Sequence, residues 1–407
     1  MKLKSDIGGR SERVDLLRGL AILAVLLLHF SLTYSLISSP LAAVFPADWL
    51  RALFLNGNYG VTIFFVISGY LITSNSLKRY AELGRTSLRS FYTLRAARIL
   101  PPLLLVLLII VPLGCLGLPS FRNEHAGVPL PASLFVLGVL SVLTFWHNVL
   151  MESVGYFNYG MNIFWSLSVE EVFYLAFPLV CVTLRRDFLI ALVCLALIAV
   201  APMYRSAHAD NDLYYMYGYL ACFDAIALGC LTAMLRARVP APPSLRLPLT
   251  VFGSLLLAVS YLYGISGHEV WGFSVVALST ACLLFSDSPS DSLSDARRMP
   301  RISQSWALPL APLRWLGRHS YELYLFHIVI LAAMRNFVPR GQLDAVWKLP
   351  ALLAFIPVSA LAAHIVARYF AEPLNRTLRS RYGVGEAIRV RLPAAGTAAP
   401  NPTAADI

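Results

Sequence analysis

Residues 13–30 read RVDLLRGLAILAVLLLHF, and this stretch alone indicates a helix that crosses a membrane. Apolar residues fill the ten positions between Arg18 and His29. A spanning helix needs about 20 predominantly apolar residues, and the apolar character continues to about residue 37. The segment is too long for a cleavable signal peptide and lacks a small-residue cleavage site, so we expect it to remain as the first helix.

The composition extends this conclusion to the whole chain. Of 407 residues, 58% are hydrophobic and 14% are charged, whereas a soluble domain carries roughly a quarter charged residues. Because only helices can span a bilayer in segments this continuous, we predict an all-α, polytopic transmembrane helix bundle. Eleven apolar segments are candidates, at about 14–37, 60–77, 99–118, 132–150, 165–184, 187–204, 214–235, 247–264, 268–285, 315–334 and 349–370.

Basic residues predict the orientation of these segments, because Lys and Arg concentrate in cytoplasmic loops. The basic connections 78–98, 236–246 and 286–314 fall on one side only if either 132–150 or 165–184 does not cross. We assign that role to 132–150, as a re-entrant or interfacial segment, which leaves about ten crossings. Both termini are then cytoplasmic, 27 of 33 Lys and Arg lie inside, and six lie outside: Arg51, Arg122, Arg205, Arg335, Arg340 and Lys348.

This topology divides the chain into three parts. We expect a short cytoplasmic segment (1–13), one membrane domain (14–372), and a basic, disordered cytoplasmic tail (373–407). The Ser/Asp/Pro-rich loop 286–304 is also expected to be flexible. The net charge of +11 indicates loop charge and not nucleic-acid binding, because no basic run is interleaved with aromatic residues. The six cysteines lie in apolar segments without a CxxC pair, so we expect buried thiols.

The first helix carries the strongest chemical signal. His29 is the eleventh residue after Arg18, and eleven steps of about 100° place both side chains on one stripe, about 16 Å apart along the axis. Asp15 lies three residues before Arg18 and can pair with it. An ionisable residue inside a span is costly, so His29 is a functional candidate, and imidazole can accept a proton near neutral pH. The alternative is a buried histidine that another helix satisfies.

Two further motifs come from the next two segments. Arg95 and Arg98 share one helix face, where paired guanidinium groups suit phosphates, although they also serve as plain cytoplasmic anchors. In GVTIFFVISGY (60–70), the small residues Gly60, Ser68 and Gly69 favour close helix packing over substrate contact.

The segment WSLSVEEVFYL (165–175) offers the adjacent carboxylates Glu170 and Glu171. Adjacent residues point about 100° apart, so both are not expected to face one site. Ser168 and Glu171 fit a capping box at a helix start, which leaves Glu170 as the better catalytic candidate.

The segment SYELYLFHIVIL (320–331) carries a second histidine inside the membrane. Tyr321, Tyr324 and His327 recur every three residues, so they predict a polar stripe that faces the bundle interior. We interpret His147, His319 and His364 as core or interfacial residues. No HExxH, CxxC or acidic cluster is present, so we expect no metal, and GxSxG and P-loop motifs are also absent.

Taken together, these motifs resemble the membrane-bound acyltransferase 3 family. The arginine and histidine of the first helix, GVTIFFVISGY, RAAR at 95–98 and WSLSVEEVFYL stand in the family's order, and the resemblance covers residues 13–372. It implies an active site with His29, Arg18, Glu170 and Glu171, and coenzyme A binding by Arg95, Arg98 and Arg18. Asp15, Ser68, Trp165, Tyr324 and His327 are secondary candidates. We expect no fused hydrolase-like periplasmic domain of the kind that some relatives append.

The resemblance implies an integral O-acyltransferase of the bacterial inner membrane. We expect it to move an acyl group, acetyl by preference, from cytoplasmic acyl-CoA to a hydroxyl of an extracytoplasmic glycan or lipid-linked saccharide. His29 then acts as general base or as a covalent acyl carrier. The alternatives are a transporter or flippase of a lipid-linked sugar, an acyltransferase for a small molecule such as a macrolide, and a non-catalytic scaffold. The sequence leaves the acceptor and the oligomeric state open.

Overall fold

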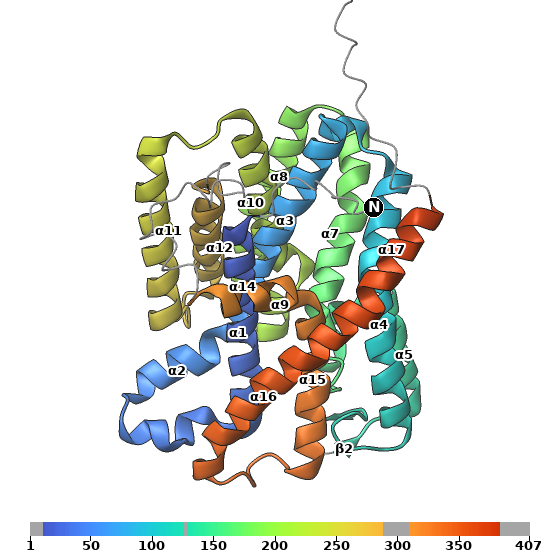
Figure 1. Ribbon diagram of the computed structural model, residues 1–407, viewed down its shortest axis with the longest axis vertical. Coiled ribbons are helices and arrows are strands. Elements are labelled where there is room, and N and C mark those ends of the chain that lie inside the picture. Colours follow the sequence, from blue (N-terminus) through green and yellow to red (C-terminus); the bar gives the residue numbers. More distant parts are fainter. Residues whose placement is uncertain (1–10, 126–127, 288–308, 383–407) are drawn as a thin grey trace, which may run out of the picture.

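The computed structural model describes residues 11–125, 128–287 and 309–382, and these residues form a helical bundle (Figure 1). The long helices are α1 (Glu12–Tyr34), α3 (Tyr59–Tyr80), α4 (Leu88–Cys115), α7 (Phe164–Leu184), α8 (Asp187–Ala207), α10 (Tyr219–Arg238), α11 (Pro243–Tyr263), α12 (Glu269–Phe285), α15 (Ser320–Phe337) and α16 (Ala345–Val366).

Shorter elements connect them. The short helices are α2 (Ala47–Leu55), α5 (Ala132–Leu143), α6 (His147–Val154), α9 (Asp212–Tyr217), α14 (Ala311–Arg318) and α17 (Glu372–Arg381). Single turns are η1 (Leu36–Ser38), η2 (Pro40–Ala43), η3 (Asn56–Asn58), η4 (Leu83–Arg85) and η5 (Ala367–Ala371), and β1 (Glu124–His125) pairs with β2 (Val128–Pro129) in an antiparallel hairpin. The prediction of an all-α polytopic bundle is confirmed.

The helix lengths agree with the predicted topology. Among the described residues, eight helices are long and apolar enough to cross a membrane. The other two predicted crossings correspond to α12 and α15, with 17 and 18 residues. Helix α5 has 12 residues, or about 18 Å, which is too short for a hydrocarbon core of about 30 Å. A turn at Phe145, with φ +62°, separates α5 from α6, which fits a segment that does not cross.

The two ends of the bundle differ in charge. The end that we call the basic end holds the start of α1, the end of α3, the start of α4 and α17. The other end, called the far end, holds α2, α9 and the β hairpin; α2 and β2 lie at the bottom of Figure 1. Helix α16 crosses the front of the bundle diagonally from the far end and continues through η5 into α17.

Small residues set the closest helix contacts, as the sequence predicted for Gly60 and Gly69. A Cβ atom on Gly69 would lie 1.9 Å from the Ile226 carbonyl oxygen of α10, and one on Gly60 would lie 2.5 Å from the Ala21 carbonyl oxygen of α1. Backbones therefore touch along both faces of α3. Ser68 was predicted to pack in the same way, but its hydroxyl contacts Glu170 and Tyr174 of α7.

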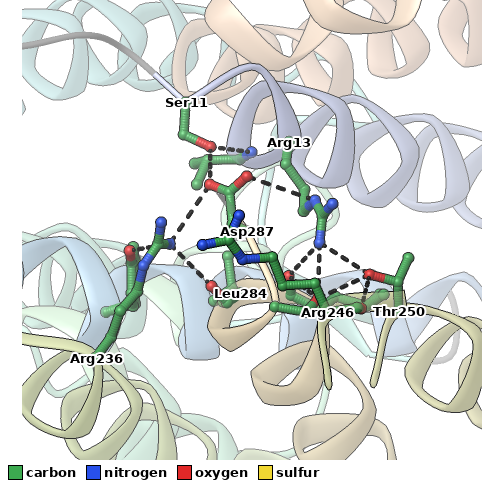
Figure 2. A network of polar contacts seen from close by, with 11 residues as sticks. Ser11, Arg13, Arg236, Arg246, Thr250, Leu284 and Asp287 are labelled. Carbon is green, nitrogen blue, oxygen red and sulfur yellow. Dashed lines mark hydrogen bonds and ion pairs between the residues drawn. The ribbon is translucent and has the colours of Figure 1, made fainter. Parts of the chain in front are cut away.

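A polar network fixes the start of α1 at the basic end. Figure 2 shows the Asp287 carboxylate between Ser11, Arg13 and Arg236. The Ser11 hydroxyl donates to Asp287 over 2.7 Å, and the Arg13 and Arg236 guanidinium groups lie 3.6 and 3.5 Å from the same carboxylate. Because Arg236 belongs to α10 and also donates to the Leu284 carbonyl at the end of α12, the network ties α1 to both helices. It thereby sets the position of Arg18 and His29.

Two predictions about helix ends are wrong. Helix α7 begins at Phe164, so Ser168 lies one turn inside it and cannot form the predicted capping box with Glu171. The Ser168 hydroxyl instead accepts the His147 backbone N–H over 3.1 Å, which joins α7 to α6. The tail was predicted to be disordered from residue 373, but Glu372–Arg381 is helical, because α16 continues through η5 and packs back on α4. The remaining tail and most of loop 286–304 lie outside the described residues.

Candidate active site

A cavity of about 850 Å³ opens at the basic end between helices α1, α3, α4, α7, α15 and α17. It lies between two apolar cores: Val61 and Phe65 belong to the core around α3, and Leu167 and Leu325 to the core around α7 and α15. The residues that line it on α3 run from Val61 to Tyr80, which corresponds to about 28 Å along the helix. The cavity is therefore long, and it reaches from the basic end toward the middle of the bundle.

Basic side chains surround the mouth of this cavity. Arg18 and Arg98, both predicted to bind coenzyme A, line it together with Lys78, Arg79 and Arg379. Arg379 lies close enough to Arg79 and Arg98 for their charges to repel one another. Like charges that converge on an open cavity create a strong field for an anion. The mouth of the cavity is thus strongly basic.

Sequence reasoning missed three of these cations. Lys78 and Arg79 stood in a basic connection that we interpreted as a membrane anchor. Arg379 was assigned to the disordered tail, and only the continuation of α16 into α17 brings it onto α4. The sequence did contain an indication of this basic mouth. Six basic residues lie in 78–98, which is more positive charge than orientation requires.

Deeper in the cavity, Arg95 holds both predicted carboxylates. Its guanidinium group lies 2.9 Å from Glu170 and 3.0 Å from Glu171, and it stacks on the Tyr174 ring. Ser68 contacts both Glu170 and Tyr174. Tyr174, which the sequence analysis did not single out, completes this cluster on the third turn of α7.

The cluster bears on two predictions. Glu170 and Glu171 were not expected to face one site, and of the two only Glu170 is among the described residues that line the cavity. The guanidinium fork of Arg95 nevertheless contacts both carboxylates. Arg95 was predicted to bind phosphate, and in the structure its guanidinium group contacts two carboxylates. Buried charged groups need partners of opposite charge, so the pairing with Arg95 fixes the positions of both carboxylates.

His29 contacts the second predicted histidine. The Nε2 atom of His327 on α15 lies 2.9 Å from the Nδ1 atom of His29 on α1. The Nδ1 atom of His327 lies 3.0 Å from the Leu323 carbonyl oxygen. The structure therefore brings together two residues that are 298 positions apart in the sequence.

These contacts assign the tautomers of the neutral imidazoles. A carbonyl oxygen only accepts, so the Nδ1 atom of His327 carries the proton and its Nε2 atom carries a lone pair. His29 must then donate from Nδ1, which leaves the lone pair of His29 on Nε2. A free Nε2 lone pair is what a general base or an imidazole nucleophile needs.

The histidine pair lies beside the inner end of the cavity. Tyr324 lines the cavity, and its ring centroid lies 5.8 Å from that of His327. Its hydroxyl donates to the Ile163 carbonyl over 3.0 Å and contacts Ser166 over 2.7 Å. Among the described residues that line the cavity, neither histidine appears, so Tyr324 separates the pair from the cavity. The predicted stripe of Tyr321, Tyr324 and His327 is confirmed in its inward orientation.

The remaining candidates lie around this centre. Trp165 packs edge-to-face on Phe65, whose ring lines the cavity, with centroids 6.1 Å apart. Asp15 lies at the basic end, where Arg318 of α14 approaches it to 3.3 Å, a partner that the sequence did not predict. His319 and His364 contact each other over 3.2 Å away from the cavity lining, and His147 is fully buried, as their assignment to the core implied.

Comparison with known proteins defines the family. Residues 11–367 match the family model described as "Acyltransferase domain". This match covers most of the chain, so the protein belongs to that family. None of the solved structures is significantly similar to it.

Several curated relatives of the chain come from Staphylococcus aureus. The chain is 26% identical to "Putative O-acetyltransferase SACOL0978" of strain COL over 387 residues, which cover 89% of this chain and 57% of that protein. It is 24% identical to "O-acetyltransferase OatA" of strain NCTC 8325 over 388 residues, with the same shares of 89% and 57%. The chain thus spans little more than half the length of these relatives.

Proposed function

We propose that this protein is an O-acetyltransferase that takes an acetyl group from acetyl-CoA in the cavity and passes it to a hydroxyl group of a glycan. The observation that carries the proposal is the cavity itself, which connects a strongly basic mouth with side chains packed against the His29–His327 pair. The relatives named as O-acetyltransferases support acetyl as the transferred group and oxygen as its acceptor.

The shape and charge of the cavity suit coenzyme A as co-substrate. Its volume falls within the usual range for small-molecule sites, about 300–1,000 Å³. Arg98, Arg379 and Arg79 offer charge-assisted contacts to phosphate groups at the mouth. A pantetheine arm is narrow and extended, so it fits the inward part between Phe64, Leu325 and Tyr324. In this assignment the thioester stops near Tyr324.

His29 supplies the proton-accepting atom in the proposed reaction. In direct transfer, the acceptor hydroxyl oxygen forms a bond to the thioester carbonyl carbon, the C–S bond breaks, and the hydroxyl proton moves to His29 Nε2. The proton then neutralises the departing thiolate. In a relay, Nε2 itself attacks the thioester, the C–S bond breaks and CoA departs as the thiolate. The acceptor oxygen then displaces the imidazole from the acetyl carbon, and the hydroxyl proton is released to neutralise the thiolate, which restores the neutral imidazole. Both routes need a small displacement of Tyr324, because it stands between the cavity and the histidines.

The basic end belongs to the cytoplasm in this proposal. Acyl-CoA is cytoplasmic, and the excess of Lys and Arg at this end gives the same orientation. Both termini then lie in the cytoplasm, and the membrane is the inner membrane of a bacterium. The acceptor approaches from the far end, and His29 stands between the two substrates. A glycan or lipid-linked saccharide of the cell envelope satisfies this geometry.

The test combines a whole-cell and a purified measurement. Mass spectrometry compares surface glycans from cells with the gene, without it, and with His29→Ala. We expect an acetyl-sized mass increase only with the unaltered gene. In lipid nanodiscs, the His29→Ala protein should bind acetyl-CoA normally and transfer nothing. Unchanged glycan acetylation by the variant would overturn the role of His29, and a protein that binds no acetyl-CoA would overturn the donor assignment.

A single-turnover experiment separates the two routes. Labelled acetyl-CoA is mixed with the protein without an acceptor, and the reaction is stopped with a denaturant at neutral pH, because acyl-imidazoles hydrolyse in acid. Label on a peptide that contains His29 supports the relay. Labelled CoA ester that stays intact until a glycan is added supports direct transfer.

A further inference from the structure

A second polar cluster lies one helical turn beyond His29, toward the far end of the bundle. The Thr33 hydroxyl donates to the His29 carbonyl oxygen over 3.0 Å, so its oxygen is left to accept the Tyr159 hydroxyl at 2.7 Å. Residues four apart share a helix face, so Thr33 continues the stripe of Arg18 and His29. Thr33 and Tyr159 are not among the described residues that line the basic cavity.

Arginines surround this cluster. The Arg335 guanidinium lies over the Tyr159 ring, 4.6 Å from its centroid. Arg335 approaches Glu124 to 3.9 Å, and Arg122 approaches the same carboxylate to 3.4 Å. One carboxylate thus faces two guanidinium groups, and Arg340 is close enough to Tyr159 to act on it electrostatically. Within residues 11–125, 128–287 and 309–382, the cluster carries more positive than negative charge.

This charge stands out against the rest of the far end. Sequence analysis placed six Lys and Arg residues on that side, and Arg122, Arg335 and Arg340 are three of them. Positive charge at the extracytoplasmic side contributes nothing to orientation under the positive-inside rule. We therefore expect the positive charge that is concentrated beside the helix of His29 to bind a ligand.

Hydrogen bonds hold the cluster rigidly. The Asn158 amide donates to Asn123 over 2.7 Å, and the Ser120 backbone N–H donates to Asn336 over 3.0 Å. These bonds fix the β hairpin to the loop that carries Tyr159 and to the end of α15, which lies beside β2 in Figure 1. The side chains of Arg335 and Arg122 remain 27% and 39% exposed, so a solute can reach both.

We propose that Arg335, with Tyr159 and Arg122, is the acceptor subsite, and that it recognises an anionic group, a carboxylate or a phosphate, of the saccharide. This inference rests on the proposed function and adds the chemical class of the acceptor. The anion binds at the guanidinium groups, while the hydroxyl to be acetylated points along Thr33 toward His29. A carboxylate belongs to an acidic sugar, and a phosphate belongs to a lipid-linked one.

Direct binding to the full-length protein in nanodiscs tests the subsite without catalysis. Two matched pairs of probes are used: methyl glucuronide against methyl glucoside, and a prenyl-phosphate glucose against the corresponding prenyl glucoside. We expect one anionic probe to bind about 10- to 100-fold more tightly than its neutral partner, the range of one charge-assisted hydrogen bond. The pair that shows the preference identifies the source of the anion.

Variants assign the preference to this cluster. Arg335→Ala should abolish it and Arg335→Lys should keep part of it, because the charge remains without the fork. Arg51→Ala is the matched control, since Arg51 lies at the same end and pairs with Asp48 on an exposed helix. Equal binding of charged and neutral probes by the unaltered protein overturns the inference, and so does an unchanged preference in Arg335→Ala.

Acetyl-CoA binding is measured in the same samples. Unchanged acetyl-CoA affinity in Arg335→Ala shows that the variant is folded. If no form of the protein binds acetyl-CoA, the proposed donor fails, while the comparison of acceptor probes still decides the subsite.

Discussion

The imidazole of His327 accepts a hydrogen bond from the imidazole of His29, with 2.9 Å between the two nitrogen atoms. The Leu323 carbonyl oxygen fixes the proton on the other nitrogen of His327. A backbone oxygen on α15 therefore determines which nitrogen of His29, on α1, carries the lone pair. His327 is a positioning residue in this arrangement.

Replacement of His327 by Phe should reduce acetyl transfer at least about 100-fold, the contribution of a correctly oriented base. Phe fills the space but accepts no hydrogen bond, so His29 is free to adopt the wrong tautomer. His327→Gln should recover part of the rate, because its side-chain oxygen can accept from His29 Nδ1. Transfer is measured with labelled acetyl-CoA in vesicles.

Acetyl-CoA affinity is the control for that experiment. His327 does not line the cavity, so both variants should bind acetyl-CoA as the unaltered protein does. Equal activity of His327→Phe and the unaltered protein would show that the tautomer of His29 does not depend on His327.

Replacement of Arg98 or Arg379 by Ala should raise the KM for acetyl-CoA about 10-fold, because each removes a charge-assisted contact to phosphate. The same variants should leave the KM for acetyl-pantetheine unchanged, since that donor lacks the nucleotide phosphates. Arg381→Ala is a matched control for Arg379→Ala, because Arg381 also lies on α17 but does not line the cavity. A parallel rise for both donors would exclude phosphate recognition at this mouth.

The sequence predicts the elements of this site better than their contacts. Helix periodicity placed Arg18 and His29 on one stripe, and Tyr324 and His327 on another, because both members of each pair lie on one helix. The contact between the two stripes depends on the register of α1 against α15. Glycine contacts such as Gly19 against Leu313 set the position of α1 against the neighbouring α14. A single sequence contains no signal for how two helices are aligned along their axes.

The shared partner of Glu170 and Glu171 could not be predicted for a different reason. The angle between neighbouring residues on a helix describes Cβ directions, so it correctly left only Glu170 facing the cavity, but it does not describe the reach of a partner. Arg95 enters from α4 with a long side chain and a forked head, so it contacts both carboxylates from between them. The predicted capping box failed because α7 begins four residues earlier, where Phe164 continues from the preceding turn.

Replacement of Gly69 by Ala should lower the free energy of unfolding of the bundle by about 1–3 kcal/mol, the usual cost of overpacking. The added Cβ would lie 1.9 Å from the Ile226 carbonyl oxygen, and backbone cannot move aside as a side chain can. Gly160→Ala is the control, because its nearest atom would lie 3.6 Å away. Thermal unfolding in nanodiscs, followed by tryptophan fluorescence, should show a lower Tm for the first variant alone. Equal Tm values would mean that α3 and α10 can separate without cost.

Glu152, on the short helix α6, should make stability depend on pH. Burial raises the pKa of its carboxyl group to about 7, and His208 opposes that shift only in part. Between the ordinary pKa of about 4.5 and pH 7, the folded protein keeps a proton that the unfolded chain has lost, so stability falls as pH rises through this window and is constant above it. Glu152→Gln removes this titration, and the variant should therefore have a higher Tm than the unaltered protein at pH 8 and a similar Tm at pH 4.5. We expect thermal unfolding across this range to show a smaller pH slope for Glu152→Gln; identical slopes would mean that the carboxyl group titrates alike in both states.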